Sequence, residues 1–89
     1  MDSRQRHEEA AAVRAEIRAW IARKGLTHSQ VAAQMGHAPS WVSKRIGAKP
    51  SVPILVDDLM AFADVLGIPA AEFFRRESTT GQSINYRSA

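Results

Sequence analysis

Histidines and carboxylates are the side chains in this sequence whose types most often bind metals or transfer protons. The three histidines, His7, His28 and His37, are widely spaced, and the 89 residues include no cysteine. This spacing matches no zinc motif, because such motifs bring Cys and His ligands close together along the chain. Adjacent carboxylates such as Asp57 and Asp58 can act as a general acid and base, but at the start of a helix they more often stabilise the helix dipole. We therefore predict no metal site and no catalytic carboxylate pair.

The hydroxyl groups and glycines carry no catalytic signature either. Ser40 and Ser43 have no histidine and carboxylate placed as partners in a nucleophilic triad. No glycine-rich loop of the kind that cradles phosphates occurs in the sequence. We therefore expect a protein that is not an enzyme and that uses no cofactor.

Charge is distributed unevenly along the chain, although the net charge is only +3. Residues 25–53 contain Lys44, Arg45 and Lys49 and no acidic residue, whereas residues 54–74 contain acidic residues and no basic one. This asymmetry favours a face that binds an anion. A stretch of this length with few acids also arises by chance, so charge alone leaves both interpretations open.

Length and composition indicate one small domain. Hydrophobic residues make up 45% of the chain, as is usual for a soluble globular protein. Without cysteine the chain forms no disulfide, which weakly favours a reducing compartment. The apolar runs are too short for a membrane span or a signal peptide. We expect a cytoplasmic, nucleoid-associated protein with no membrane partner.

Periodicity and capping signals predict five short helices and no strand. An apolar stripe at three- and four-residue steps predicts a first helix from about residue 8 to 23, followed by a left-handed residue at Gly25. The stripe consists of Ala10, Val13, Ile17, Trp20 and Ile21. Thr27 and Gln30 have the spacing of a capping box, which opens a second helix of about eight residues that stops at Gly36.

Prolines and glycines bound the remaining helices. Pro39 suits the first position of a third helix, which ends at Gly47. A loop with two prolines follows over residues 47–53, and a fourth helix is expected from Leu55 to about residue 66. The fifth is predicted to start at Pro69, with Phe73 and Phe74 facing inward and one of the two rings closing the core. We place a flexible arm at residues 1–7, the domain at 8–74 and a flexible tail at 75–89, since residues 78–89 are polar and small.

The second and third helices are separated by too few residues to pack antiparallel side by side. A short turn containing glycine makes the two helices cross steeply, as in a helix-turn-helix unit. Such a unit needs a small residue where the helices cross, a left-handed turn residue and an apolar plug, and Ala32, Gly36 and Val42 supply these. Trp41 can pack against the first helix, contact a thymine methyl or lie exposed near the backbone, and packing is the preferred interpretation.

Residues 26–36 (LTHSQVAAQMG) followed by residues 41–44 (WVSK) resemble the Cro/repressor type of helix-turn-helix domain, the lambda-repressor-like or Xre family. Residues 59–74 resemble the fourth helix, the Leu-Gly stop and the fifth helix of that family, so the resemblance covers about residues 8–74. Four features depart from the pattern. Ala38 replaces the usual Ser or Thr cap, Arg45 replaces an aliphatic residue whose role Ile46 can take, His28 replaces Gln, and the loop at 47–57 is longer.

The resemblance implies an all-α, five-helix domain that binds double-stranded DNA, with the third helix in the major groove. Base-reading positions then fall on Pro39, Ser40, Ser43 and Lys44. Phosphate contacts fall on His28, Arg45 and Lys49, which fix register rather than sequence. It further implies a phage or bacterial repressor that binds an operator as a homodimer, with Val65, Ile68 and Phe74 as candidates for the dimer surface.

An alternative within the same resemblance is an antitoxin or protein-interaction module. The tail then serves a protein partner, because a disordered segment can fold on a partner surface. Two further roles for the tail remain open, namely dimerisation and phosphate contacts through Arg87.

Overall fold

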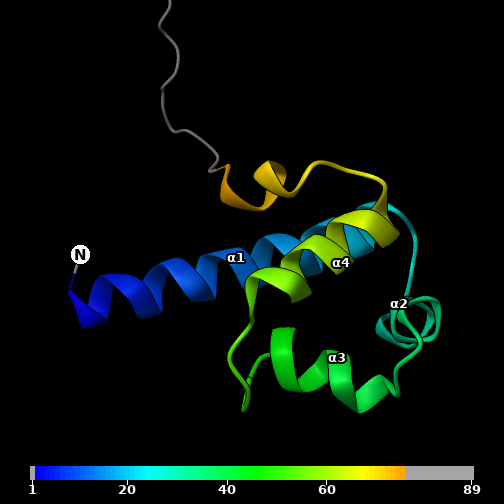
Figure 1. The fold of residues 1–89 in the computed structure, drawn as a ribbon, viewed down its shortest axis with the longest axis horizontal. Helices are drawn as coiled ribbons and strands as arrows, with labels where there is room; N and C mark the ends of the chain where they lie inside the picture. Colours follow the sequence, from blue (N-terminus) through cyan, green and yellow to red (C-terminus); the bar gives the residue numbers. More distant parts are fainter. Residues whose placement is uncertain (1, 76–89) are drawn as a thin grey trace, which may run out of the picture.

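The computed structural model describes residues 2–75, which form four α-helices and one short 3₁₀ helix without any strand (Figure 1). The elements are α1 (Ser3–Arg23), α2 (His28–Met35), α3 (Pro39–Ile46), α4 (Val56–Leu66) and the 3₁₀ helix η1 (Ala70–Phe74). The all-α prediction is confirmed. The fifth predicted helix is only a 3₁₀ turn that follows Pro69, and residues 76–89, including Arg87, lie outside the described part of the chain.

The first helix begins five residues earlier than its apolar stripe predicts, so the expected flexible arm at residues 1–7 is wrong for Ser3 onward. Asp2 caps the helix: its Oδ1 accepts from the Gln5 amide at 2.8 Å, and the Gln5 side chain accepts from the Asp2 amide at 3.0 Å. The residues of this capping box are polar, and the first turn of α1 is exposed. Periodicity of apolar residues reports only the part of a helix that is buried, which is why it misses this start.

The predicted start and stop of α2 are both confirmed. Thr27 Oγ1 accepts from the Gln30 amide at 3.0 Å, and the Gln30 side chain accepts from the Thr27 amide at 2.8 Å. Gly36 ends the helix with φ +78°, a left-handed conformation that costs glycine little. The His37 amide then donates to the Ala32 carbonyl at 2.9 Å, which closes the turn that leads into α3.

A single core joins all five elements. Its fully or nearly fully buried members are Val13, Ile17, Ile21, Val31, Ala32, Val42, Ile46, Phe62, Ala63, Leu66 and Phe73. Phe73 closes the core as one of the two predicted rings, whereas the inward orientation expected for Phe74 is wrong because that side chain is 54% exposed. Trp20 is half-buried against the core.

The packing places α3 at one edge of the molecule. In Figure 1, α4 lies between α3 and η1, so α3 and η1 are on opposite sides of the fold. α3 packs mainly on α2 and also touches α1. No helix among residues 2–75 combines the length and apolarity needed to cross a membrane.

Candidate nucleic-acid interface

The third helix has one buried and one exposed side. Val42 and Ile46 are completely buried, so Ile46 is an aliphatic core residue of this helix, whereas its neighbour Arg45 is not. Ser40, Ser43 and Lys44 are exposed, and their three- and four-residue spacing places them on one face of the helix. Pro39 is exposed at the first position of the same helix.

All four predicted base-reading residues thus come together on the outer side of α3. Ser43 Oγ donates to the Pro39 carbonyl at 3.4 Å, which is long for a hydroxyl donor and makes this a weak bond. The Ser43 hydroxyl can therefore exchange this weak bond for a stronger one to another acceptor at little cost in free energy. Ser and Lys side chains on one face offer both donors and an acceptor to the edges of base pairs.

The start of α3 lacks a side-chain cap. Ala38 occupies the cap position and makes no side-chain hydrogen bond. Pro39 carries no N–H, and the Trp41 amide donates to the Ala38 carbonyl at 3.0 Å, so the Ser40 amide is the first-turn group that a Ser or Thr cap would have held. The positive end of the helix dipole favours an anion in the same place.

The loop after α3 folds back onto that helix. The amides of Ser51 and Val52 donate to the Lys44 carbonyl at 2.9 and 3.2 Å. Lys49 is exposed within this loop, and the two hydrogen bonds keep the loop next to the end of α3. His28, the second phosphate candidate, is half-buried as the first residue of α2.

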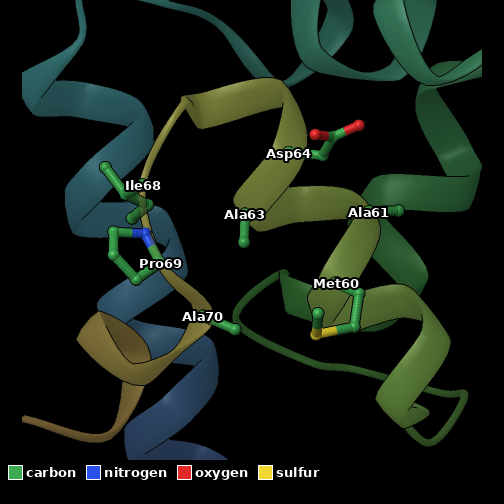
Figure 2. A pocket seen from close by; sticks show the side chains of 7 residues that line it. All are labelled: Met60, Ala61, Ala63, Asp64, Ile68, Pro69 and Ala70. Carbon is green, nitrogen blue, oxygen red and sulfur yellow. The ribbon is translucent and has the colours of Figure 1, made fainter.

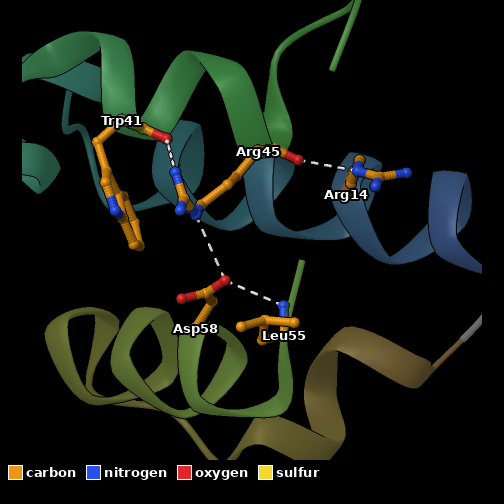
Figure 3. Close-up of polar contacts among 5 residues, drawn as sticks. All are labelled: Arg14, Trp41, Arg45, Leu55 and Asp58. Atoms are coloured by element: carbon orange, nitrogen blue, oxygen red, sulfur yellow. Dashed lines mark hydrogen bonds and ion pairs between the residues drawn. The ribbon is translucent and has the colours of Figure 1, made fainter. Parts of the chain in front are cut away.

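Arg45, the third phosphate candidate, points away from the exposed face of α3 and toward α4 (Figure 3). Its Nε lies 3.4 Å from Asp58 Oδ2, and the two side chains are 18% and 13% exposed. This buried Nε makes no hydrogen bond, so the contact with Asp58 is an ion pair only. Its Nη1 donates to the Trp41 carbonyl at 3.2 Å. The structure therefore assigns Arg45 to a contact between α3 and α4 instead of a phosphate contact.

Trp41 lies in the middle of a stack that involves the same arginine. The His37 ring is parallel to Trp41 with centroids 4.1 Å apart, and the Arg45 guanidinium carbon is 4.0 Å from the Trp41 centroid. Two groups this close to one centroid must occupy opposite faces of the ring. Trp41 also contacts Phe62 of α4. Trp41 therefore packs, as the preferred interpretation expects, but its ring partners are His37, Arg45 and Phe62, and none of these three belongs to α1.

Two arginines that the sequence interpretation overlooked hold the end of α3. Arg14 Nε donates to the Arg45 carbonyl at 2.8 Å, and Arg18 Nη1 donates to the Ile46 carbonyl at 2.6 Å (Figure 3 shows the Arg14 contact). The only sequence feature that could have indicated this role is the spacing of the two arginines. They lie four residues apart and flank the buried stripe that contains Ile17. Nothing in the sequence indicates that their partners are backbone carbonyls.

A second exposed feature runs from the start of α4 to the end of η1. The large hydrophobic residues Leu55, Val56, Met60 and Phe74 are each more than half exposed. An open depression of about 450 Å³ lies nearby (Figure 2). It is lined by Met60, Ala61, Ala63, Asp64, Ile68, Pro69 and Ala70. Of the dimer candidates, only Phe74 presents a large exposed surface, because Val65 and Ile68 are half-buried against the core.

The remaining ionisable candidates are the adjacent carboxylates at the start of α4. Asp57 and Asp58 lie in the first turn of α4, and Asp58 Oδ2 accepts from the Leu55 amide at 3.0 Å. Residues 2–75 contain no group of three or more His, Asp or Glu side chains close enough together to hold a metal ion. Comparison of the chain with protein-family models, with curated proteins and with solved structures gave no match.

Proposed function

We propose that this protein is a sequence-specific regulator of transcription that binds double-stranded DNA through α3. One observation carries the proposal: α3 is anchored by two completely buried residues and turns Ser40, Ser43 and Lys44 outward on a single face. The surrounding stretch of chain contains no acidic residue. The major groove of DNA is wide enough to admit an α-helix, and the donors and acceptors on the base edges there distinguish the four base pairs.

Phosphate contacts on either side of α3 fix its register in the groove. Lys49 follows α3 in the loop that folds back on it, and His28 stands at the N-terminus of α2. The N-terminal ends of α2 and α3 add partial positive charge. Such contacts hold the protein on any duplex, whereas Lys44 and the two serines select the sequence.

The regulator acts as a repressor by occupying its operator as a homodimer. Two copies related by a two-fold axis read half-sites about 34 Å apart, one turn of DNA. The exposed Phe74 is the best candidate for the contact between copies, because η1, which ends at this residue, lies on the opposite side of α4 from α3 (Figure 1). That arrangement leaves the DNA-reading face free.

Selection from random duplexes tests the proposal directly. At about 150 mM salt, purely electrostatic binding is weak because affinity falls steeply with ionic strength. We expect an enriched inverted repeat in the recovered DNA. Recovery of a single half-site argues for a monomer, and binding that disappears above low salt without any enrichment overturns the proposal.

A protein-interaction module is the second candidate, favoured by the exposed hydrophobic residues on α4. Leu55 and Val56 are 59% and 72% exposed, and adjacent exposed apolar residues of this size often mark a site for a protein partner. The double substitution Leu55→Ser/Val56→Ser separates the two functions. DNA selection is unchanged in this variant if α3 carries the function, whereas binding to a co-expressed protein partner is lost if α4 does.

A further inference from the structure

The C-terminal end of α3 has a donor for each of its last four carbonyl groups. The last turn of any helix leaves these carbonyls without partners inside the helix. In α3 the carbonyl of Ser43 accepts from the Gly47 amide at 2.9 Å, that of Lys44 from the Ser51 and Val52 amides, that of Arg45 from Arg14, and that of Ile46 from Arg18. Two of the four are therefore held by side chains of α1.

This ending differs from that of the two neighbouring helices. Gly36 and Gly67 close α2 and α4 with left-handed conformations, at φ +78° and +70°. Gly47 instead has φ −67° and ψ 176°, so the chain leaves α3 in an extended direction without the usual 6→1 closure. The carbonyls of Arg45 and Ile46 therefore depend on donors from elsewhere in the fold.

Arginine side chains suit this role for electrostatic and geometric reasons. The C-terminal end of a helix carries partial negative charge, which a guanidinium group stabilises. A charged donor also makes a shorter and stronger hydrogen bond than a neutral one. Both bonds are partly buried, and they join segments 31 and 28 residues apart in sequence. Arg14 and Arg18 lie one helical turn apart on α1, so together they hold two successive carbonyls of α3.

We infer that Arg14 and Arg18 are positioning residues that fix the angle at which α3 is presented to DNA. The inference rests on the proposed function of α3. The two arginines hold the C-terminal end of the helix on the side that faces α1, while Ser40, Ser43 and Lys44 on the exposed side read bases, so a small rotation of α3 displaces all three reading side chains together. Their contribution is to sequence discrimination and not to phosphate binding.

The test uses single substitutions with matched controls in the full chain. Arg14→Met and Arg18→Met keep an apolar stem and remove the donors, and Arg14→Lys and Arg18→Lys keep a charged donor. Arg4→Met removes the same charge from the exposed first turn of α1. Each variant is tested for thermal unfolding, for affinity toward the selected operator and a scrambled duplex, and for the dependence of that affinity on salt.

We expect the methionine variants to fold and to lose discrimination by roughly fivefold to 150-fold, the range for one good base contact. Their salt dependence should equal that of Arg4→Met, and the lysine variants should recover most of the discrimination. In the wild-type protein without DNA, the Nε–H of Arg14 should exchange slowly with solvent, because it is hydrogen-bonded and partly buried.

Three results would overturn the inference. These residues are phosphate ligands if each methionine substitution reduces the slope of log affinity against log salt concentration by about 0.9 and lowers affinity equally for both duplexes. Unchanged discrimination in folded methionine variants removes the positioning role. A wild-type protein that does not distinguish operator from scrambled DNA refutes the proposed function itself, and this outcome is visible in the wild-type measurement alone.

Discussion

Lys44 and Arg45 are adjacent in sequence, yet their side chains leave α3 in different directions. Lys44 is exposed on the face shared with Ser40 and Ser43, whereas Arg45 lies between Trp41 and Asp58. Successive residues on a helix are rotated by about 100°, so one of two neighbouring basic residues can face solvent while the other packs. Of these two basic side chains, Arg45 therefore contributes to the fold, and Lys44 is left exposed, as its proposed role in base reading requires.

Lys44→Ala should weaken binding to the preferred operator by about 1–3 kcal/mol and relax selection at one base position. The lysine is exposed and its removal leaves the core untouched, so thermal stability should change little. Selection from random DNA with this variant, beside the wild-type protein, measures the effect. An equal loss of affinity on every duplex would make Lys44 a phosphate contact.

Arg45→Ala should instead destabilise the fold by about 1–3 kcal/mol, because it leaves Asp58 without its ion pair and removes one face of the Trp41 stack. Urea unfolding measures the loss. Lys49→Ala is the matched control, since it removes an exposed cation nearby and should lower the salt slope of DNA binding by about 0.9. If Arg45→Ala lowers that slope and leaves stability unchanged, Arg45 binds phosphate after all.

At the scale of helices and loops, features that depend on residues within one turn could be predicted from the sequence. Contacts between residues far apart in the sequence could not. The Thr27–Gln30 capping box and Gly36 fixed both ends of α2, because each signal acts within one turn. The contacts of Arg14 and Arg45 could not be predicted. Their partners are backbone carbonyls or side chains brought close only by the tertiary fold, and no residue type marks a carbonyl as an acceptor.

Position 47, where α3 joins the following loop, has no room for a side chain larger than that of glycine. A Cβ at this position would lie 2.5 Å from the Ser43 carbonyl oxygen, so Gly47→Ala should push the loop away from the helix and destabilise the fold by about 1–3 kcal/mol. The amide shifts of Ser43, Ser51 and Val52 in NMR spectra should change with it. Gly47→Ala without change at these amides would contradict the expected displacement.

Gly25→Ala is the matched comparison for this junction. Gly25 has φ +70°, and a Cβ at this position would meet nothing within 4 Å. Its substitution therefore costs only the strain of a left-handed residue, about 1–2 kcal/mol. It should leave the amides around α3 unchanged. The two variants thus separate the effect of strain at any turn from the effect of displacing the loop after α3.

At the scale of the whole molecule, α4 lies between α3, the proposed DNA-reading helix, and η1, which ends at the exposed Phe74 (Figure 1). A two-fold dimer formed through Phe74 can therefore turn both α3 helices toward one side of a duplex without either contact obstructing the other. The charge distribution agrees with this division, because residues 54–74 contain no basic residue and the stretch around α3 contains no acidic one.

Phe74→Asp should abolish this dimer while the monomer stays folded, since the substituted side chain is 54% exposed and the core ring is Phe73. Sedimentation with operator DNA should then show one copy per half-site and no preference for the inverted repeat over a single half-site. Leu55→Asp is the control, because Leu55 is similarly exposed at the start of α4. A dimer that survives Phe74→Asp and is lost in Leu55→Asp would move the contact between copies to the start of α4. The role proposed for α3 on DNA would be unaffected, but the spacing of the two half-sites would follow from a different two-fold axis.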